Sequence, residues 1–377
     1  MSWIAGGQPM AEITTVLGPI SPEKLGFTSM HEHTVCDMSV FRRRYEDILP
    51  GHLPVAPDDP VRLDNLGSLK HFFILSRDAL DLRDEELIAA EAADFKNAGG
   101  NAMVDMSVPG LRCDLPAIRR ISQKTGVHII ATTGLYAEDS WPERYRAMSM
   151  RDYMDFMRRE IENGIDETGI RAGHVKIMIT DSMMFSVEPF SAQQKLLLRA
   201  AVRISNETGL SLTVHPPLDS KASLREVVKV MLDEGLSPGR AVIAHAELFF
   251  VPQDLATLVL DPSSWQLDVD FAKELLDQGF NISIDSFGHY HDAEAIGSVI
   301  TADWQRMAGL VALLKSGYSS QIVIGTDIFL KILTRRFGGD GYCRLTDFVV
   351  PWLRRLDIDE SFINMLTVEN PARLLAH

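Results

Sequence analysis

The sequence predicts a single-domain α/β protein built as a (β/α)8 TIM barrel. One unit recurs along the chain, in which a helical pattern ends at glycine and is followed by a short apolar run. This order is typical of alternating helices and strands. Eight such strands can close into a parallel barrel that is buried on both faces. An open doubly wound sheet would show the same alternation, but no GxGxxG follows the first strand, so the barrel is favoured.

In the first half of the chain, short apolar runs rich in β-branched residues alternate with helical patterns that end before glycine. The predicted strands are 26–30, 101–106, 127–133 and 174–180, and the predicted helices are 84–97, 114–124 and 151–163. Glycines at 99, 100, 126, 169 and 173 separate these helices from the strands that follow. Glycine at these places ends a helix and permits a turn.

The second half of the chain continues the alternation. The predicted helices are 191–209, 224–234, 269–278 and 303–315, and the predicted strands are 211–214, 241–244, 281–285 and 321–325. Ser191 followed by Gln194 is typical of a capping box and marks the clearest helix start. Residues 1–25 are predicted to form an N-terminal extension, and 26–377 the barrel.

Composition excludes several classes of protein. Of the 377 residues, 46% are hydrophobic and 24% are charged, as in an ordinary folded protein and unlike a disordered chain. The 37 basic and 52 acidic residues give a net charge of −15, which would repel a phosphate backbone. A small-molecule substrate is therefore expected, with no nucleic acid as partner.

Cysteine content and the N-terminus predict a cytoplasmic protein. The three cysteines, Cys36, Cys113 and Cys343, are too few and too scattered for a disulfide framework or a thiolate zinc site. The first basic residue is Lys24, so the chain begins without the basic and apolar segments of a secretory signal. No apolar stretch approaches the roughly 18 residues of a membrane span, so no membrane is expected as a partner. A homodimer is left open.

Polar residues stand where several predicted strands end. His31 and His33 follow the first strand two residues apart, so both imidazoles face the same way. His215, His245 and Asp327 end the fifth, sixth and eighth strands. On a barrel these ends share one rim, where four histidines and a carboxylate predict a metal site. The alternative is that each polar residue packs against a separate partner.

Lys176 lies within the apolar strand 174–180, where a buried ammonium group is unfavourable. A carboxylate partner would relieve this, and from the residues alone such an ion pair is the preferred alternative. The other outcome is a neutral amine, which can react with carbon dioxide to give a carbamate. The two oxygens of a carbamate could bridge two metal ions.

Motifs from the first strand region to the C-terminus carry a family resemblance. They are Gly18-Pro19-Ile20, Leu25-Gly26-Phe27-Thr28, Met30-His31-Glu32-His33, Ala131-Thr132-Thr133-Gly134-Leu135-Tyr136, Lys176, His215, His245, Asp327, Gly338-Gly339-Asp340-Gly341-Tyr342 and Asn370-Pro371-Ala372-Arg373. The chain thereby resembles the phosphotriesterase family of the amidohydrolase superfamily. The resemblance implies two divalent metal ions per chain, usually zinc, with manganese and cobalt as alternatives.

The resemblance also implies a role for each ligand. His31, His33 and Asp327 would hold the buried metal, His215 and His245 the more exposed one, and Lys176, carboxylated by carbon dioxide, would bridge them. A hydroxide shared by the two metals is a nucleophile at neutral pH. Asp327 would be the catalytic residue that orients this hydroxide and accepts its proton.

Two departures from the family pattern bear on the substrate. In phosphotriesterases proper, two neighbouring acidic residues follow the histidine of the sixth strand, and a histidine follows the aspartate of the seventh. Here Glu247 stands beside Leu248, and Ser286 follows Asp285. Related lactonases place a tyrosine after the third strand, as Tyr136 is placed here. These features predict a lactonase or carboxylic ester hydrolase with incidental organophosphate hydrolysis. The alternatives are a phosphotriesterase proper and a non-catalytic ligand-binding protein on the same barrel.

The loop after the eighth strand carries Lys331, Arg335 and Arg336 in a strongly acidic chain. Cations beside a metal site indicate an anionic group on the substrate. The alternative is a solvated helix face, because Lys331 and Arg335 have i,i+4 spacing. His289 and His291 in the seventh loop are expected to be solvated rather than to bind metal.

Overall fold

The computed structural model describes residues 11–44, 54–179, 190–217, 220–252, 254–290 and 300–377. Its main sheet has eight strands in chain order, each parallel to the next. The strands are β3 (Thr28–Glu32), β4 (Ala102–Asp105), β5 (His128–Leu135), β6 (His174–Met178), β7 (Leu212–His215), β8 (Ala241–Ile243), β9 (Asn281–Ile284) and β10 (Ile322–Ile324). All eight predicted strands are confirmed. The first strand begins and ends two residues later than predicted, so His31 and Glu32 lie inside it.

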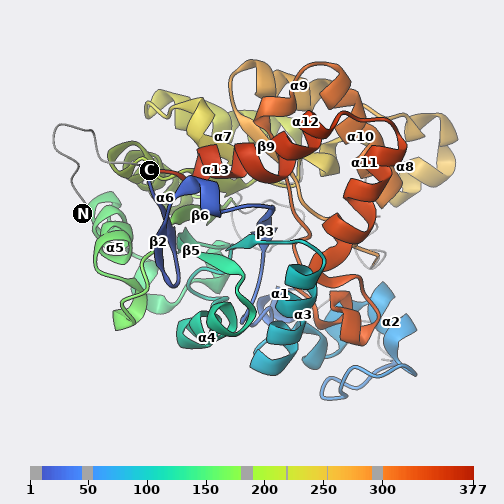
Figure 1. Ribbon diagram of the computed structural model, residues 1–377, viewed down its shortest axis with the longest axis horizontal. Coiled ribbons are helices and arrows are strands. Elements are labelled where there is room, and N and C mark those ends of the chain that lie inside the picture. Colours follow the sequence, from blue (N-terminus) through green and yellow to red (C-terminus); the bar gives the residue numbers. More distant parts are fainter. Residues whose placement is uncertain (1–10, 45–53, 180–189, 218–219, 253, 291–299) are drawn as a thin grey trace.

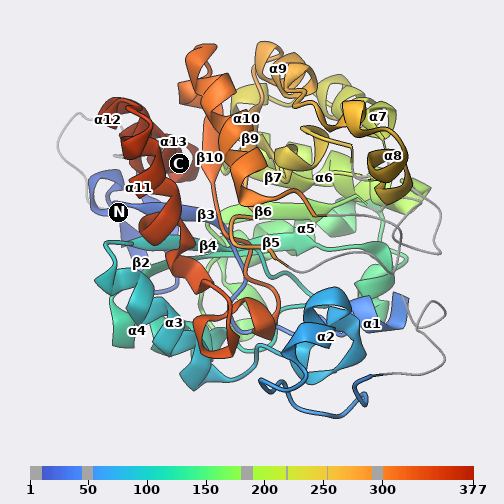
Figure 2. The same cartoon turned by 90° about the vertical axis from the view of Figure 1, so that its right-hand side faces the viewer.

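Helices surround the sheet, as Figures 1 and 2 show from two directions. They are α1 (Val40–Arg44), α2 (Leu66–His71), α3 (Glu85–Asn97), α4 (Leu115–Thr125), α5 (Met150–Glu162), α6 (Ala192–Thr208), α7 (Lys221–Asp233), α8 (Leu255–Leu260), α9 (Asp270–Asp277), α10 (Asp303–Lys315), α11 (Val350–Arg355), α12 (Glu360–Asn364) and α13 (Asn370–Leu375). Every predicted helix is present. Ser191 caps α6 by accepting a hydrogen bond from the Gln194 N–H, which confirms the predicted helix start and one of the two hydrogen bonds of the predicted capping box. The fold is therefore the expected (β/α)8 barrel.

The barrel closes where β10 meets β3. The N–H of Asp327, just after β10, donates to the His31 carbonyl oxygen at 2.9 Å. The N–H of Thr326 donates to the Glu32 carboxylate at 3.0 Å. Gly325 is needed at this seam, because a Cβ there would lie 2.9 Å from the His31 carbonyl oxygen. The close approach of these backbones brings Asp327 next to the His31–His33 pair.

A hairpin of β1 (Ile13–Thr15) and β2 (Gly18–Ile20) covers the amino ends of the strands. Ile13 of this hairpin and Leu374 of α13 join Val104 and Val323 of the sheet in one buried apolar cluster. Burial of such side chains stabilises this end of the barrel by roughly 1.5 to 3 kcal/mol each. The carboxyl ends of the strands are left for polar residues, as on other barrels of this kind. Among the described residues, no helix combines the length and apolar character needed to cross a membrane.

Candidate metal centre

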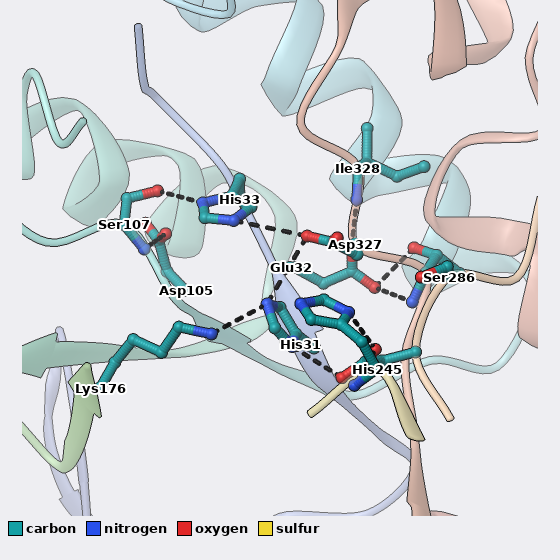
Figure 3. Close-up of polar contacts among 12 residues, drawn as sticks. His31, Glu32, His33, Asp105, Ser107, Lys176, His245, Ser286, Asp327 and Ile328 are labelled. Atoms are coloured by element: carbon teal, nitrogen blue, oxygen red, sulfur yellow. Dashed lines mark hydrogen bonds and ion pairs between the residues drawn. The ribbon is translucent and has the colours of Figure 1, made fainter. Parts of the chain in front are cut away.

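The side chains predicted to bind metal converge at the carboxyl ends of the strands, and Figure 3 shows His31, His33, Lys176, His245 and Asp327 of this set. Nε2 of His33 lies 3.4 Å from Oδ1 of Asp327, and Nε2 of His31 lies 3.6 Å from the same oxygen. The ring centroid of His245 lies 4.9 Å from that of His31 and 4.4 Å from that of His215. All five side chains are buried. The structure thus unites all the strand-end residues that the sequence singled out.

Lys176 projects from β6 toward this cluster, with its Nζ 3.4 Å from Nε2 of His31. The side chain is fully buried, and it forms no ion pair with any carboxylate in the described part of the chain. Burial lowers the pKa of Lys176 to about 8, although Asp285 and Asp327 oppose this shift. The ion pair that the residues alone favoured is therefore not observed, and a large fraction of the amine is neutral near pH 8.

The Nδ1 atom of each of the four histidines faces an acceptor. Nδ1 of His31 lies 2.7 Å from Asp285 Oδ2, and Nδ1 of His245 lies 2.7 Å from Asp285 Oδ1. Nδ1 of His33 lies 2.9 Å from the Ser107 hydroxyl. Nδ1 of His215 lies 3.0 Å from the carbonyl oxygen of Pro216. With the proton on Nδ1, each ring keeps a lone pair on Nε2, the arrangement found in histidines that bind metal.

Burial keeps most of this cluster in the form that binds metal. It lowers the pKa of His31 to about 4 and that of His215 well below its usual value. Both rings are therefore neutral at pH 7. Burial alone would raise the pKa of Asp327, but its histidine neighbours outweigh burial and hold that pKa below the ordinary range. Asp327 is therefore ionised at pH 7 and, with His31 and His33, offers a set of N and O ligands of the kind zinc prefers.

Asp285 was not predicted to take part in the site. Asp285 directly follows β9, and its carboxylate is fully buried. It accepts a hydrogen bond from His31, a proposed ligand of the buried metal, and another from His245, a proposed ligand of the more exposed metal. Burial opposes its ionisation, but His245 and His31 hold its pKa well below the usual value. Each of its oxygens faces the Nδ1 atom of one of these histidines, an arrangement that orients both rings. The signal was present in the sequence, since Asp285 ends an apolar strand just as Asp327 does.

Two residues of the site have left-handed backbone conformations, which residues other than glycine adopt at a cost. His245 has φ of 55° and Asp327 has φ of 49°. The N–H of His245 donates to Oδ1 of Asp285 at 3.1 Å, which stabilises this conformation. Strained residues of this kind cluster at functional sites, where the surrounding structure enforces them.

The predicted substrate residues fall into two groups. The ring of Tyr136 packs edge-on against that of His215, with 6.0 Å between centroids, so this residue lies at the site. Lys331 is buried in an ion pair with Asp78, and Arg335 lies 3.7 Å from Asp347. The Arg336 side chain makes no described contact with the four histidines or with Tyr136.

The helix face suggested for the eighth loop is wrong. Residues Lys331–Leu333 and Arg335–Phe337 form two separate 3-10 turns, because the chain is extended at Thr334 between them. The expectation that His289 is solvated is also wrong. His289 is 5% exposed and hydrogen-bonds to the backbone beside Asp327. His291 lies outside the described residues.

A buried guanidinium group that the sequence did not single out lies beside Tyr136. The Arg44 side chain, at the end of α1, is 2% exposed and pairs with Asp139 in the loop after β5. Its Cζ lies 5.9 Å from the centroid of the Tyr136 ring. Tyr136 therefore contacts both the guanidinium group of Arg44 and the ring of His215, a proposed metal ligand.

Comparison with known proteins assigns the family. A family model described as the phosphotriesterase family matches residues 11–375. The chain belongs to the phosphotriesterase family. The N-acetyltaurine hydrolase of Tetraodon nigroviridis is 29% identical over 366 residues, which are 97% of both chains. Members of this family generally depend on two metal ions, and the His and Asp groups described above fit such ions.

Two solved structures of similar proteins share the fold. A resiniferatoxin-binding protein from Rhodobacter sphaeroides has a TM-score of 0.82 and 26% identity, covering 99% of this chain and 98% of that chain. A lactonase from Listeria monocytogenes has a TM-score of 0.73 and 21% identity, covering 97% and 98% of the two chains. The named hydrolases among the family's relatives establish that the chain is a hydrolase, as the sequence predicts. This disfavours a non-catalytic binding protein.

One departure from the family pattern is now visible in three dimensions. Ser286 stands where phosphotriesterases proper carry a histidine, and its N–H donates to Oε1 of Glu247 at 3.1 Å. Glu247 is fully buried near Arg306, with 3.9 Å between Oε1 and Nε. The contact with Glu247 is made by the main chain of Ser286, and the side chain at this position is a hydroxyl in place of an imidazole.

Proposed function

We propose that this protein hydrolyses a carboxylic acyl bond with two divalent metal ions, most simply zinc, and that its substrates are lactones or other carboxylic esters. The observation that carries the proposal is the orientation of the four histidines. All four have Nδ1 at an acceptor, which leaves Nε2 to bind metal. Lys176 lies among them without a carboxylate partner in the described residues, as a bridging carbamate requires. Manganese and cobalt remain alternatives to zinc.

The chain's own residues support the chemistry as follows. When bound, two divalent ions lower the pKa of a water molecule and polarise the substrate carbonyl. Asp327, ionised and directed at the ligand Nε2 atoms, accepts the proton of the attacking water. Asp285 keeps His31 and His245 in the required tautomer. Tyr136 lies beside His215, where it can contact the substrate acyl group.

A second candidate is hydrolysis of an N-acyl amide that carries an anionic group. The relatives named N-acetyltaurine hydrolase support this alternative, since their named substrate joins an acetyl amide to a sulfonate. Arg44 is a candidate for contact with such an anion, because its guanidinium group, which pairs with Asp139, lies beside Tyr136. Phosphotriester hydrolysis is less well supported, because Ser286 replaces the histidine of phosphotriesterases proper.

Metal analysis and a substrate panel test the function. Protein purified without chelator is expected to contain about two divalent ions per chain, because the ligand set divides into two groups. The panel should contain a neutral lactone, a phosphorylated sugar lactone, N-acetyltaurine and a neutral organophosphate triester. We expect turnover of acyl substrates that is lost after exhaustive chelation and restored by zinc. Full activity in the chelated protein, or turnover of the triester alone, would contradict the proposal.

Replacement of Arg44 tests whether this residue binds the anionic group of a charged substrate. We expect Arg44→Met to raise KM for anionic acyl substrates about tenfold or more, because a charge-assisted hydrogen bond contributes roughly 1.5 to 3 kcal/mol. KM for a neutral lactone should stay nearly constant. The measurement is steady-state kinetics on the two substrates. Asp139→Asn is the matched control, since it breaks the ion pair and keeps the cation.

The same kinetics decide between the two candidate anion sites. Lys331→Met, Arg335→Met and Arg336→Met should be measured beside Arg44→Met. A rise in KM for anionic substrates alone in one of these three variants would assign the role to the eighth loop, as the sequence suggested. Equal changes in KM for charged and neutral substrates in all four variants would show that none of these cations binds the anionic group of the substrate.

Free thiols at Cys36, Cys113 and Cys343 support the cytoplasmic setting that the sequence predicts, because disulfides are rare in reducing compartments.

A further inference from the structure

We propose that Glu32 and His289 are positioning residues that hold Asp327 in the geometry in which it accepts a proton. The inference rests on the proposed function, in which Asp327 is the proton acceptor. Neither residue is among the proposed metal ligands. Both contact the main chain of the three-residue segment Thr326–Asp327–Ile328, and Glu32 also accepts the Thr326 hydroxyl.

Glu32 binds this segment on both sides of Asp327. Its Oε1 accepts the N–H of Thr326 at 3.0 Å and the Thr326 hydroxyl at 2.6 Å. Its Oε2 accepts the N–H of Ile328 at 3.2 Å. The hydroxyl of Ser29 also donates to Oε1. Since Glu32 is fully buried in β3, its carboxylate ties the segment that carries Asp327 to the strand that carries His31.

His289 binds the carbonyl oxygens of the same segment. Its Nε2 lies 2.9 Å from the carbonyl oxygens of both Thr326 and Asp327, so the Nε2–H donates to them. Burial lowers the pKa of His289 to about 4, which keeps the ring neutral at pH 7. Because this nitrogen faces main-chain carbonyls, the ring acts on the backbone of Asp327.

These contacts matter because Asp327 has an unfavourable backbone conformation. Its φ of 49° is left-handed, and an unsupported chain would leave this region. The N–H of Asp327 is itself bound to the His31 carbonyl oxygen at 2.9 Å. The main-chain groups from the Thr326 N–H to the Ile328 N–H thus all have partners. The three N–H groups donate to β3, and the two carbonyl oxygens accept from His289. These contacts fix the direction of the Asp327 carboxylate.

The chemistry of Glu32 suits this task better than that of a neutral analogue. Each of its two oxygens accepts a main-chain N–H, Oε1 that of Thr326 and Oε2 that of Ile328, and Oε1 also accepts the hydroxyls of Ser29 and Thr326. Glutamine accepts through only one oxygen and would direct its NH2 group at an N–H. Glu32→Gln therefore disrupts the contacts while conserving shape.

The test compares four variants of the full chain with one control. Glu32→Gln and His289→Leu remove the contacts, His289→Gln restores a side-chain N–H donor, and Thr326→Val removes one hydroxyl. The matched control is Thr367→Val, which removes a buried hydroxyl in the C-terminal helices that donates to the Ile363 carbonyl oxygen. Two measurements are made on each: kcat and KM with zinc, and the crystal structure without metal.

For Glu32→Gln and His289→Leu, kcat is expected to fall about 10- to 100-fold, as is typical for residues that orient metal-site groups, while KM changes less than about twofold. The crystal structures should show Asp327 leaving the left-handed region. His289→Gln should recover most of the kcat, Thr326→Val should lose less than Glu32→Gln, and the control should lose thermal stability alone.

Unchanged kcat in Glu32→Gln and His289→Leu, or an unmoved Asp327 in their crystal structures, would overturn the proposal. If Glu32→Gln does not fold, His289→Leu and Thr326→Val still decide it. The crystallographic measurement needs neither metal nor substrate. A wild-type protein that turns over no acyl substrate would therefore refute the proposed function and leave the test of Asp327 positioning intact.

Discussion

Lys176→Ala is expected to lose both metal ions and nearly all turnover. In the proposed site the neutral amine would attack the carbon of carbon dioxide and release one proton, and the resulting carbamate would supply two oxygens as metal ligands. Alanine offers no such bridge, while His31, which lies 3.4 Å from the amine, keeps its Asp285 partner. Metal analysis after dialysis and steady-state kinetics measure the two losses. Acetate or propionate in the buffer should partly restore both, because a short carboxylate can occupy the space of the missing side chain.

Lys331→Ala is the matched control for this experiment, because Lys331 is the other buried lysine described here. Its ammonium pairs with Asp78, so it has no tendency to form a carbamate. This variant should keep its metal and its turnover of a neutral lactone. Retention of two metals by Lys176→Ala, or a crystal structure of the metal-loaded wild type with an unmodified ammonium at Lys176, would contradict the carbamate.

The pKa of Lys176 sets a direction for pH dependence. Only the deprotonated amine reacts with carbon dioxide, and burial lowers its pKa to about 8. The neutral fraction therefore rises as pH increases through about 8. Reconstitution of metal-free protein with zinc, under a fixed partial pressure of carbon dioxide that keeps its dissolved concentration the same at both pH values, should be faster at pH 8.5 than at pH 7. A rate that falls over this interval would show that another group controls metal loading.

The periodicity of the sequence predicted the strands and the ligands at their ends, because both can be recognised from a short stretch of neighbouring residues. A parallel barrel places the ends of its strands at one rim, so residues such as His215 and His245 could be grouped without knowledge of contacts. The roles of Glu32 and His289 could not be predicted in this way. Glu32 contacts Thr326 across the closure of the barrel, 294 residues away along the chain. No local pattern encodes such a pair.

The eighth loop shows the limit of spacing arguments. Lys331 and Arg335 have helical spacing, but the extended residue Thr334 divides the segment into two turns. The position of the Lys331 ammonium group is instead set by Asp78, a residue distant in the sequence with which it forms an ion pair. Arg44 illustrates the converse, since nothing in its local sequence indicates that it packs from the end of α1 against Tyr136. Substrate-binding residues lie on loops whose approach to one another is decided by packing.

Asp327→Asn is expected to reduce kcat about a thousandfold, which corresponds to about 4 kcal/mol of activation free energy. The amide has nearly the same shape as the carboxylate, and the backbone contacts of residue 327 do not involve the side chain. The fold should therefore persist, as thermal unfolding would show. The amide cannot accept a proton at neutral pH, whereas the wild-type carboxylate is ionised there because its pKa is held low.

Loss of metal must be separated from loss of the proton acceptor in this variant. Asp327 is also a proposed ligand beside His31 and His33, so metal affinity should fall about 10- to 100-fold. Turnover is therefore measured at zinc concentrations that saturate the variant, with bound metal determined in the same samples. Glu160→Gln is the control, since it removes a buried carboxylate of α5 that pairs with Arg112. A fully loaded Asp327→Asn protein that keeps more than about a tenth of the wild-type kcat would exclude Asp327 as the proton acceptor, because general base catalysis contributes at least about a hundredfold.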